Sequence, residues 1–239
     1  MAASRQPHPH SESVDDYLKA ILALGGPDEH RATSTALADR LGVAPPSVTN
    51  MLQKLAALPT PLVEYERHRG VRLSPAGKRR ALEILRHHRL IETFLYKLLD
   101  YPLEEVHEEA ERLEHFISER FERRIAAKLG NPDIDPHGHD IPAMDGQMPA
   151  QTSRPLAEMR ELGEFVVASI SDRDAKRLKS LTRYGIGPGV HLEVKARPME
   201  DGYSVRVGRS AKTIHLSHDA AHAIRVQAPR STPAASRTE

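Results

Sequence analysis

The helix breakers in the first third of the chain constrain its fold more than any other feature of the sequence. Gly25-Gly26-Pro27 and Gly42 each follow a short segment in which apolar residues recur every three or four positions, and Pro45-Pro46 opens a third such segment. Proline is well tolerated in the first turn of a helix, whereas glycine and proline beyond the last turn end one. The pattern therefore predicts three helices, at about residues 14–24, 35–41 and 45–58, with Ser13 as the first N-cap.

A short, basic β-hairpin is predicted after the third helix. Residues 62–66 and 71–73 alternate apolar and polar side chains, and the run Arg67-His68-Arg69-Gly70 joins them. Alternation with a period of two is typical of half-buried strands. Helix, turn, helix and hairpin in this order are the elements of a winged helix-turn-helix, whose second helix enters the major groove of DNA.

The third helix and the hairpin carry side chains that suit DNA. Polar and apolar groups near the start of the helix can hydrogen-bond to base edges or contact a thymine methyl, and the basic groups suit phosphates or the minor groove. An ordinary solvated helix exposes similar residues, so the adjoining basic hairpin is what favours DNA binding. An aromatic content of 4% without Trp disfavours single-strand binding by stacking. The predicted DNA contacts are Pro46, Ser47, Asn50, Lys54, Arg67, Arg69 and Arg72.

The rest of the chain divides into a helical part and a β-rich part. Ser74-Pro75 caps a long helix to about Leu99, and a second helix is predicted at about 103–129. Residues 131–155, rich in Pro, Gly, Asp and His, resemble a linker. Strands at 165–167, 191–194, 203–207 and 213–216, with a helix near 174–184, indicate a small β-barrel.

The stretch His107–His115 gathers metal-binding side chains on the predicted helix 103–129. Residues three and four apart share a helix face, and imidazole and carboxylate groups bind first-row divalent metals. Two more such groups stand four residues apart on the preceding helix and are expected to face the first set if the helices pack antiparallel. The chain has no Cys, so a thiolate site is excluded. The groups are His107, Glu111, Glu114 and His115, with His88 and Glu92 before them.

Charge is distributed unevenly along the chain, although the net charge is only +1. Residues 31–91 are rich in Lys and Arg, which suits a polyanionic partner, and residues 92–122 are rich in Asp and Glu, which suits cations. The alternative is two solvated helical surfaces of opposite sign. No apolar run approaches the ~20 residues that span a bilayer, and the polar N-terminus does not resemble a secretory signal. We expect no membrane association and a cytoplasmic location.

An enzyme is disfavoured by the motifs. Glu111-x-x-Glu114-His115 is near the metalloprotease pattern His-x-x-Glu-His but has Glu at the first His position, and 107–111 lacks the final His of His-Glu-x-x-His. No glycine-rich phosphate loop or nucleophile elbow is evident. The sequence indicates a regulator without catalysis.

The winged helix, the run 86–92 and the stretch His107–His115 resemble the metal-dependent repressors typified by the diphtheria toxin repressor and the manganese transport regulator. The likeness covers about residues 13–142, and the C-terminal part resembles the Src-homology-three-like domain of the longer members. It implies a homodimer on the two long helices that binds a palindromic operator when loaded with Mn²⁺, or with Fe²⁺. Carboxylates at Asp16 and Glu111 favour Mn²⁺.

The resemblance also implies two ligand sets. The primary site would use Asp16, Glu111, Glu114, His115 and either His88 or its neighbours. An ancillary site would use His88, Glu92 and His107, and the C-terminal domain would add a ligand at Asp172, with Asp174 close by. The manganese branch has an acidic ligand where this chain has Lys19, which argues against a two-metal cluster here.

Together these features predict a mainly α chain with a small β part. The predicted segments are a disordered lead at 1–12, a winged helix-turn-helix DNA-binding domain at 13–74, an α-helical dimerisation and metal-binding domain at 75–142, a linker at 143–155, a small β-barrel at 156–228 and a tail at 229–239. The expected function is repression of metal-homeostasis genes by the metal-loaded dimer. The alternative is a winged-helix regulator that senses a small molecule or binds DNA constitutively, with a structural His/Glu cluster.

Overall fold

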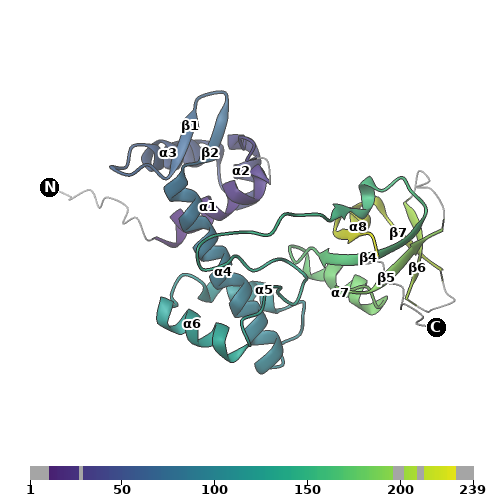
Figure 1. Cartoon of the computed structure of the whole chain (residues 1–239). Coiled ribbons are helices and arrows are strands. Elements are labelled where there is room, and N and C mark those ends of the chain that lie inside the picture. The colour runs from purple at the N-terminus through teal and green to yellow at the C-terminus, as the bar shows by residue number, and fades with distance from the viewer. Residues whose placement is uncertain (1–10, 27–28, 196–201, 209–212, 230–239) are drawn as a thin grey trace, which may run out of the picture. The chain divides into compact units, whose positions relative to one another are not determined.

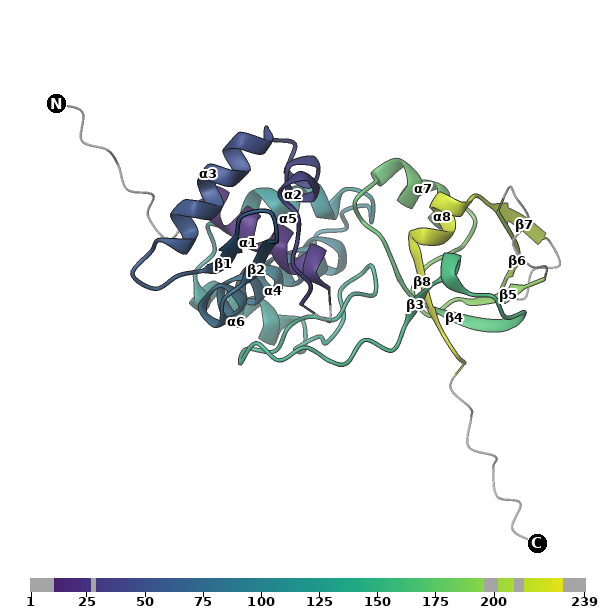
Figure 2. The same cartoon turned by 90° about the horizontal axis from the view of Figure 1, so that it is seen from above.

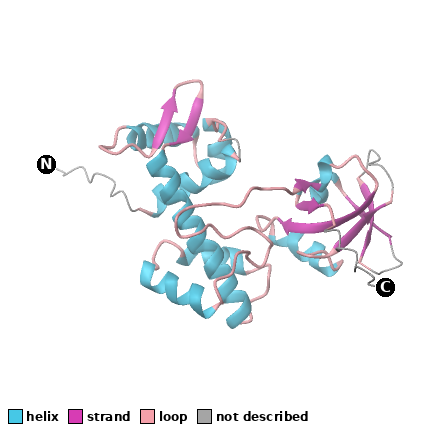
Figure 3. Ribbon diagram, in the orientation of Figure 1, coloured by secondary structure: helices cyan, strands magenta, loops and turns pink. Residues whose placement is uncertain are grey.

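The computed structural model describes residues 11–26, 29–195, 202–208 and 213–229. They form two compact units. The first contains the chain up to Phe94 together with Glu108–Asp133 and Ile141–Pro149, and the second contains Leu95–His107, Ile134–Asp140 and the chain from Ala150 onward. Helices dominate the first unit and strands the second (Figure 3). Most of the predicted lead and tail lies outside the described residues, and the predicted domain boundaries stay predictions.

Three short helices open the first unit, as the sequence predicts. They are α1 (Glu12–Gly25), α2 (Ser34–Leu41) and α3 (Pro45–Ala56). The N-cap of α1 is Ser11, whose side chain accepts from the Val14 N–H, and not Ser13. Gly42 ends α2 in the left-handed conformation, with φ at +64°, which glycine adopts without the strain of a side chain.

The hairpin after α3 is formed by β1 (Val63–Glu66) and β2 (Gly70–Leu73), in antiparallel register from Val63 opposite Leu73 to Glu66 opposite Gly70. It lies beside α3 (Figure 1). A Cβ on Gly70 would meet the Ala32 carbonyl oxygen at 2.5 Å, so the close approach of the two backbones requires glycine. The hairpin and α1 to α3 share one apolar core, which includes Leu18, Leu37, Leu52 and Val71.

Three further helices follow: α4 (Pro75–Leu98), α5 (Val106–Leu113) and α6 (Glu119–Lys128). The prediction of one helix over 103–129 is wrong, because two helices stand there. Ser118 caps the second one by accepting from the Phe121 N–H, which stabilises a new N-terminus where the apolar period alone suggests continuity. Leu90, Ile125, Ala126 and Ile141 form a core in this part of the first unit. No helix of the described residues is long and apolar enough to cross a membrane.

The second unit is built on one antiparallel sheet in the order β3-β8-β4-β5-β6-β7. The strands pair with their neighbours in antiparallel register, and short helices adjoin them (Figure 2). The elements are β3 (Arg154–Pro155), a 3-10 turn (Leu156–Glu158), β4 (Gly163–Ile170), α7 (Ala175–Arg183), β5 (His191–Val194), β6 (Tyr203–Val207), β7 (Thr213–Leu216), α8 (His218–His222) and β8 (Ile224–Gln227).

The four predicted strands and α7 are confirmed, whereas β3, α8 and β8 were not predicted. The prediction of a small antiparallel β domain holds, but its sheet is not a closed barrel. Within the described residues no pairing joins β7 to β3, and β3 has only 2 residues with which to extend that edge. Leu156, Ile170, Leu192 and Val205 belong to the core of this unit.

Candidate metal centres and DNA-binding surface

Glu114 is the centre of a charged cluster in the first unit. Its side chain is fully buried. One carboxylate oxygen, Oε1, lies 2.6 Å from Lys19 Nζ and 3.4 Å from His115 Nε2, and the other, Oε2, lies 2.6 Å from His88 Nδ1. A buried carboxylate is costly unless it is paired. Here three basic side chains from α1, α4 and the turn after α5 surround it.

Asp16 and His115 adjoin Glu114 on one side. Asp16 Oδ1 lies 3.3 Å from His115 Nε2, and the two residues and Glu114 each offer a ligand atom within 4.8 Å of the others. Hydrogen bonds to Asp15 and Asp16 outweigh the effect of burial and raise the pKa of His115 to about 10. A metal ion that uses this imidazole must therefore displace its proton.

Asp15 fixes His115 from the opposite ring nitrogen and was missed by the sequence reasoning. It is buried, its Oδ2 lies 3.5 Å from His115 Nδ1, and Arg80 binds both its oxygens at 2.9 and 3.0 Å. Burial acts to raise the pKa of Asp15, but the bonds from His115 and Arg80 hold it below its ordinary value. Its adjacency to Asp16 was the available signal.

His88 adjoins Glu114 on another side. Its Nδ1 also lies 3.7 Å from Glu111 Oε1, its Nε2 lies 3.0 Å from Glu92 Oε1, and His88, Glu111 and Glu114 form a second group whose ligand atoms lie within 4.8 Å of one another. Burial alone would lower the pKa of His88, but the charge of Glu92 and the hydrogen bonds from Glu114 and Glu92 raise it to about 10.

Lys19 binds two of the predicted ligands. Its Nζ lies 2.7 Å from Glu111 Oε1 and 2.6 Å from Glu114 Oε1. Burial opposes the charged form, yet the two carboxylates outweigh it and raise the pKa of Lys19 above its ordinary value. A fixed ammonium thus partly neutralises the carboxylates that the sequence assigns to metal.

His107 and Asp172 belong to the second unit, where His107 Nδ1 lies 3.5 Å from Asp172 Oδ2. The four groups of the stretch His107–His115 therefore do not share one helix face as predicted. The helix α5 ends at Leu113, so Glu114 and His115 lie in the turn beyond it. Asp174, expected close by, instead caps α7 by accepting from the Arg177 N–H at 3.0 Å.

Residues 134–140 of the second unit add donors that the linker prediction missed. His139 Nδ1 lies 3.2 Å from Asp135 Oδ2 and 3.8 Å from Asp172 Oδ2. The signal in the sequence was the alternation Asp135-x-His137-x-His139, which was treated as linker composition.

The predicted DNA contacts of α3 lie on its exposed face. Val48, Leu52 and Leu55 are buried in the core, which leaves the opposite face in solvent. The exposed residues of that face include Pro46, Ser47, Asn50 and Lys54.

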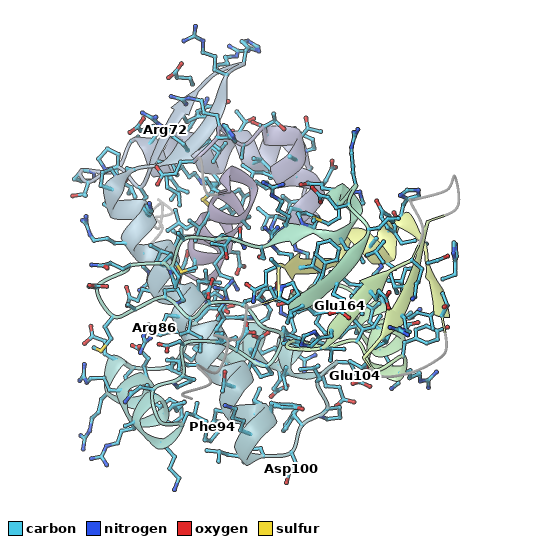
Figure 4. All side chains as sticks on the ribbon, turned by 45° about the vertical axis from the view of Figure 1, so that its right-hand side comes forward. Arg72, Arg86, Phe94, Asp100, Glu104 and Glu164 are labelled. Carbon is cyan, nitrogen blue, oxygen red and sulfur yellow. The ribbon has the colours of Figure 1, made fainter. Side chains whose placement is uncertain are left out.

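The hairpin is less basic than its sequence suggests. Arg67, Arg69 and Arg72 are exposed, but Arg69 pairs with Glu66 at 3.3 Å and Arg72 with Glu64 at 2.6 Å. Figure 4 shows Arg72 on the hairpin and Arg86 on α4. These exposed ion pairs are weak and open at little cost, so a phosphate can compete for either arginine.

Comparison with known proteins identifies the three parts of the chain. Family models described as "Iron dependent repressor, N-terminal DNA binding domain" and "Iron dependent repressor, metal binding and dimerisation domain" match residues 10–71 and 74–143. A solved structure named "Manganese-dependent transcriptional repressor complex with manganese" is 40% identical with a TM-score of 0.81, and the match covers 90% of this chain and 99% of that one. The chain belongs to the iron-dependent repressor family.

Other members of the family match over a similar length. The iron-dependent repressor IdeR of Mycobacterium tuberculosis is 29% identical, and the diphtheria toxin repressor of Corynebacterium diphtheriae is 26% identical; each match covers 90% of this chain and 97% of the relative. The solved structure "Crystal Structure of ScaR with bound Zn2+" is 33% identical with a TM-score of 0.78, covering 90% and 99%. A FeoA domain model matches residues 154–228, which fits the Src-homology-three-like domain expected there.

Membership confirms that the chain is a DNA-binding transcriptional repressor with a metal-binding and dimerisation domain, and not an enzyme. The residues of the first unit fit a divalent metal by their chemistry. Around Glu114 stand carboxylate and imidazole donors, which suit Mn²⁺ and Fe²⁺, and none of them is a soft sulfur ligand.

Proposed function

We propose that this repressor binds palindromic operators of metal-homeostasis genes as a homodimer when Mn²⁺ is bound, with Fe²⁺ as the second candidate, and that it acts in the cytoplasm. The observation that carries the proposal is the cluster around Glu114. It joins Asp16, on the first helix of the DNA-binding domain, to His115 and Glu114, in the metal-binding and dimerisation domain.

The proposed ligands follow the clusters within each unit. In the first unit Asp16 and His115 meet Glu114, and His88 adds Glu92 and Glu111, so that the donors are mainly carboxylates. A set rich in hard oxygen donors supports Mn²⁺ over later metals that favour nitrogen and sulfur. The full proposed set is Asp16, His88, Glu92, Glu111, Glu114 and His115, with His107 and Asp172 in the second unit.

The ligand positions suggest how metal controls DNA binding. A bound divalent cation supplies positive charge that this carboxylate set shares. Asp16 lies on α1, whose buried face packs with α2, α3 and the hairpin in one core, so fixing Asp16 fixes the orientation of α3. A palindromic operator demands half-sites about 34–36 Å apart per helical turn. The ligands therefore favour one arrangement of the two α3 helices in the dimer, and DNA in turn tightens metal binding by the same factor.

The test is selection of genomic DNA fragments on the purified full-length protein, with Mn²⁺ and with a chelator. We expect a palindrome to be enriched only with Mn²⁺. Asp16→Ala should fold normally but lose this metal dependence, whereas Glu12→Ala, on an exposed position of the same helix, should retain it. Equal enrichment with and without chelator would contradict the proposal and support constitutive or small-molecule control.

A further inference from the structure

The segment Ile134–Asp140 of the second unit forms a tight loop closed on itself. A bridge pairs Ile134 with Asp140, and the Asp135 N–H donates to the His139 carbonyl at 2.9 Å. Asp135 is buried, and its Oδ1 accepts from the backbone N–H groups of His137 and His139 at 2.8 and 2.9 Å. One carboxylate oxygen thus shapes the loop, while Oδ2 faces the His139 ring.

His137 is held in the orientation that metal-binding histidines adopt. Its side chain is fully buried, and Nε2 lies 3.1 Å from the Leu103 carbonyl oxygen. A carbonyl can only accept, so Nε2 carries the proton and Nδ1 carries the lone pair of the ring. Metal-ligating histidines commonly donate their other ring N–H to a backbone carbonyl in this way, which fixes tautomer and ring orientation.

The loop is anchored against the sheet by close backbone contact. The Ile170 N–H, at the end of β4, donates to the His137 carbonyl at 2.9 Å. Gly138 has φ at +90°, and a Cβ there would meet the Ala168 carbonyl oxygen at 2.1 Å. Only glycine permits this approach, so the side chains on either side of it have little freedom to move.

We propose that Asp135, His137 and His139 form a divalent-metal site on this loop, additional to the ligands assigned above. Each of the three offers one ligand atom, and these atoms lie within 4.8 Å of one another. The rings of His137 and His139 are 6.1 Å apart between centroids. The site is built before any ion arrives, because Asp135 and Gly138 already fix the backbone that presents both imidazoles.

The donor set indicates which ion the loop takes. Two imidazoles and one carboxylate suit late first-row divalent metals such as Zn²⁺, with water completing the coordination. The cluster around Glu114 is richer in oxygen donors and suits Mn²⁺ better. The loop site is therefore a Zn²⁺-class site that fastens residues 134–140 to β4, and its occupancy does not depend on whether metal controls DNA binding.

The test compares Zn²⁺ bound per chain in the full-length protein and in two loop variants, after dialysis against Zn²⁺ and metal analysis. Asp135→Asn keeps an oxygen that can accept the two backbone N–H groups but removes the negative charge. His139→Gln changes a partly exposed side chain and leaves the buried His137 in place. We expect each variant to bind one equivalent less than the native protein. His191→Gln, on an exposed position of β5, is the matched control and should bind as much as native.

A second pair separates this site from the cluster around Glu114. In the Asp16→Asn background, introducing His139→Gln should remove one further equivalent, and the absorption of bound Co²⁺ should fall by the same share. Circular dichroism of each variant checks the fold, and His139→Gln carries the test if Asp135→Asn misfolds. Equal Zn²⁺ content in the native and His139→Gln proteins would overturn the proposal, whatever the outcome of the operator selection.

Discussion

Lys19 is the residue that most distinguishes the charge balance of the first unit. Its ammonium lies within 2.7 Å of both Glu111 and Glu114 and is largely shielded from solvent. Metal-free, the two carboxylates are held together by this ammonium instead of a divalent ion. Lys19 therefore stabilises the metal-free state and weakens the attraction of the same carboxylates for metal, since less negative charge remains uncompensated.

Lys19→Met should shift this balance toward metal. We expect the metal-free variant to melt at a lower temperature than native, because two carboxylates lose their partner, and its Mn²⁺ affinity to rise about tenfold, equivalent to ~1.4 kcal/mol. Isothermal titration with Mn²⁺ and thermal denaturation with and without metal measure both effects. Lys78→Met, which removes an exposed lysine paired with Glu29, is the control and should leave Mn²⁺ affinity unchanged. Weaker Mn²⁺ binding by the Lys19 variant would contradict this account.

Asn50 and Lys54 separate base reading from phosphate contact. Both are exposed on α3, one turn apart. Asn50→Ala should reduce discrimination between operator and mutated operator by ~1–3 kcal/mol, whereas Lys54→Ala should weaken all sequences alike and flatten the salt dependence. Fluorescence anisotropy with paired DNA duplexes at several salt concentrations measures the two patterns. An unchanged sequence preference in the Asn50 variant would remove it from base reading.

At the scale of elements, the contact of α6 with α4 depends on Glu122. This buried carboxylate lies 2.5 Å from Arg86 Nε and 3.4 Å from His87 Nε2. The hydrogen bond with His87, joined by that of Arg86, outweighs burial and lowers the pKa of Glu122. A carboxyl whose folded pKa is lowered contributes stability above its unfolded value, and loses that contribution as pH falls through the folded value.

Glu122→Gln should therefore destabilise the protein in a pH-dependent way. At pH 7 we expect a loss of about 1–3 kcal/mol in the free energy of unfolding, as for a hydrogen bond to a charged group. The difference from native should shrink below pH ~4.5, the ordinary range of a glutamate. Urea denaturation between pH 7 and 3.5 measures it. Glu119→Gln, on the exposed side of the same helix, should differ little from native at any pH. A difference that stays constant with pH would argue against an ionised Glu122.

Local signals predicted the elements well, and long-range contacts explain the failures. Breakers such as Gly42 and Pro45 act on their own neighbourhood, so α1 to α3 were predicted within a few residues of their ends. The division of α5 from α6 escaped because the cap Ser118 competes with an apolar period that continues across it. The donors at Asp135 and His139 escaped because only the folded chain brings the loop against β4 and Asp172.

At the scale of the whole molecule, the dimerisation domain leaves apolar side chains in solvent. Phe116 is 72% exposed, and Leu113 and Phe121 nearby in the sequence are also exposed in the first unit. Isolated exposed apolar residues are ordinary, but a group of large ones in a segment matched by a dimerisation domain indicates where the second copy binds.

Phe116→Glu should therefore give a monomer that still binds metal. A charge in the centre of an apolar interface has to be desolvated on association, and this cost opposes dimer formation. Sedimentation velocity should show half the native mass, and operator affinity should fall at least a hundredfold because a single half-site contact remains. Mn²⁺ content per chain should stay at the native value, which shows that the neighbouring His115 is undisturbed. Met144→Glu, at a similarly exposed apolar position of the same unit, should remain dimeric. A Phe116 variant that sediments as a dimer would place the interface elsewhere on the domain.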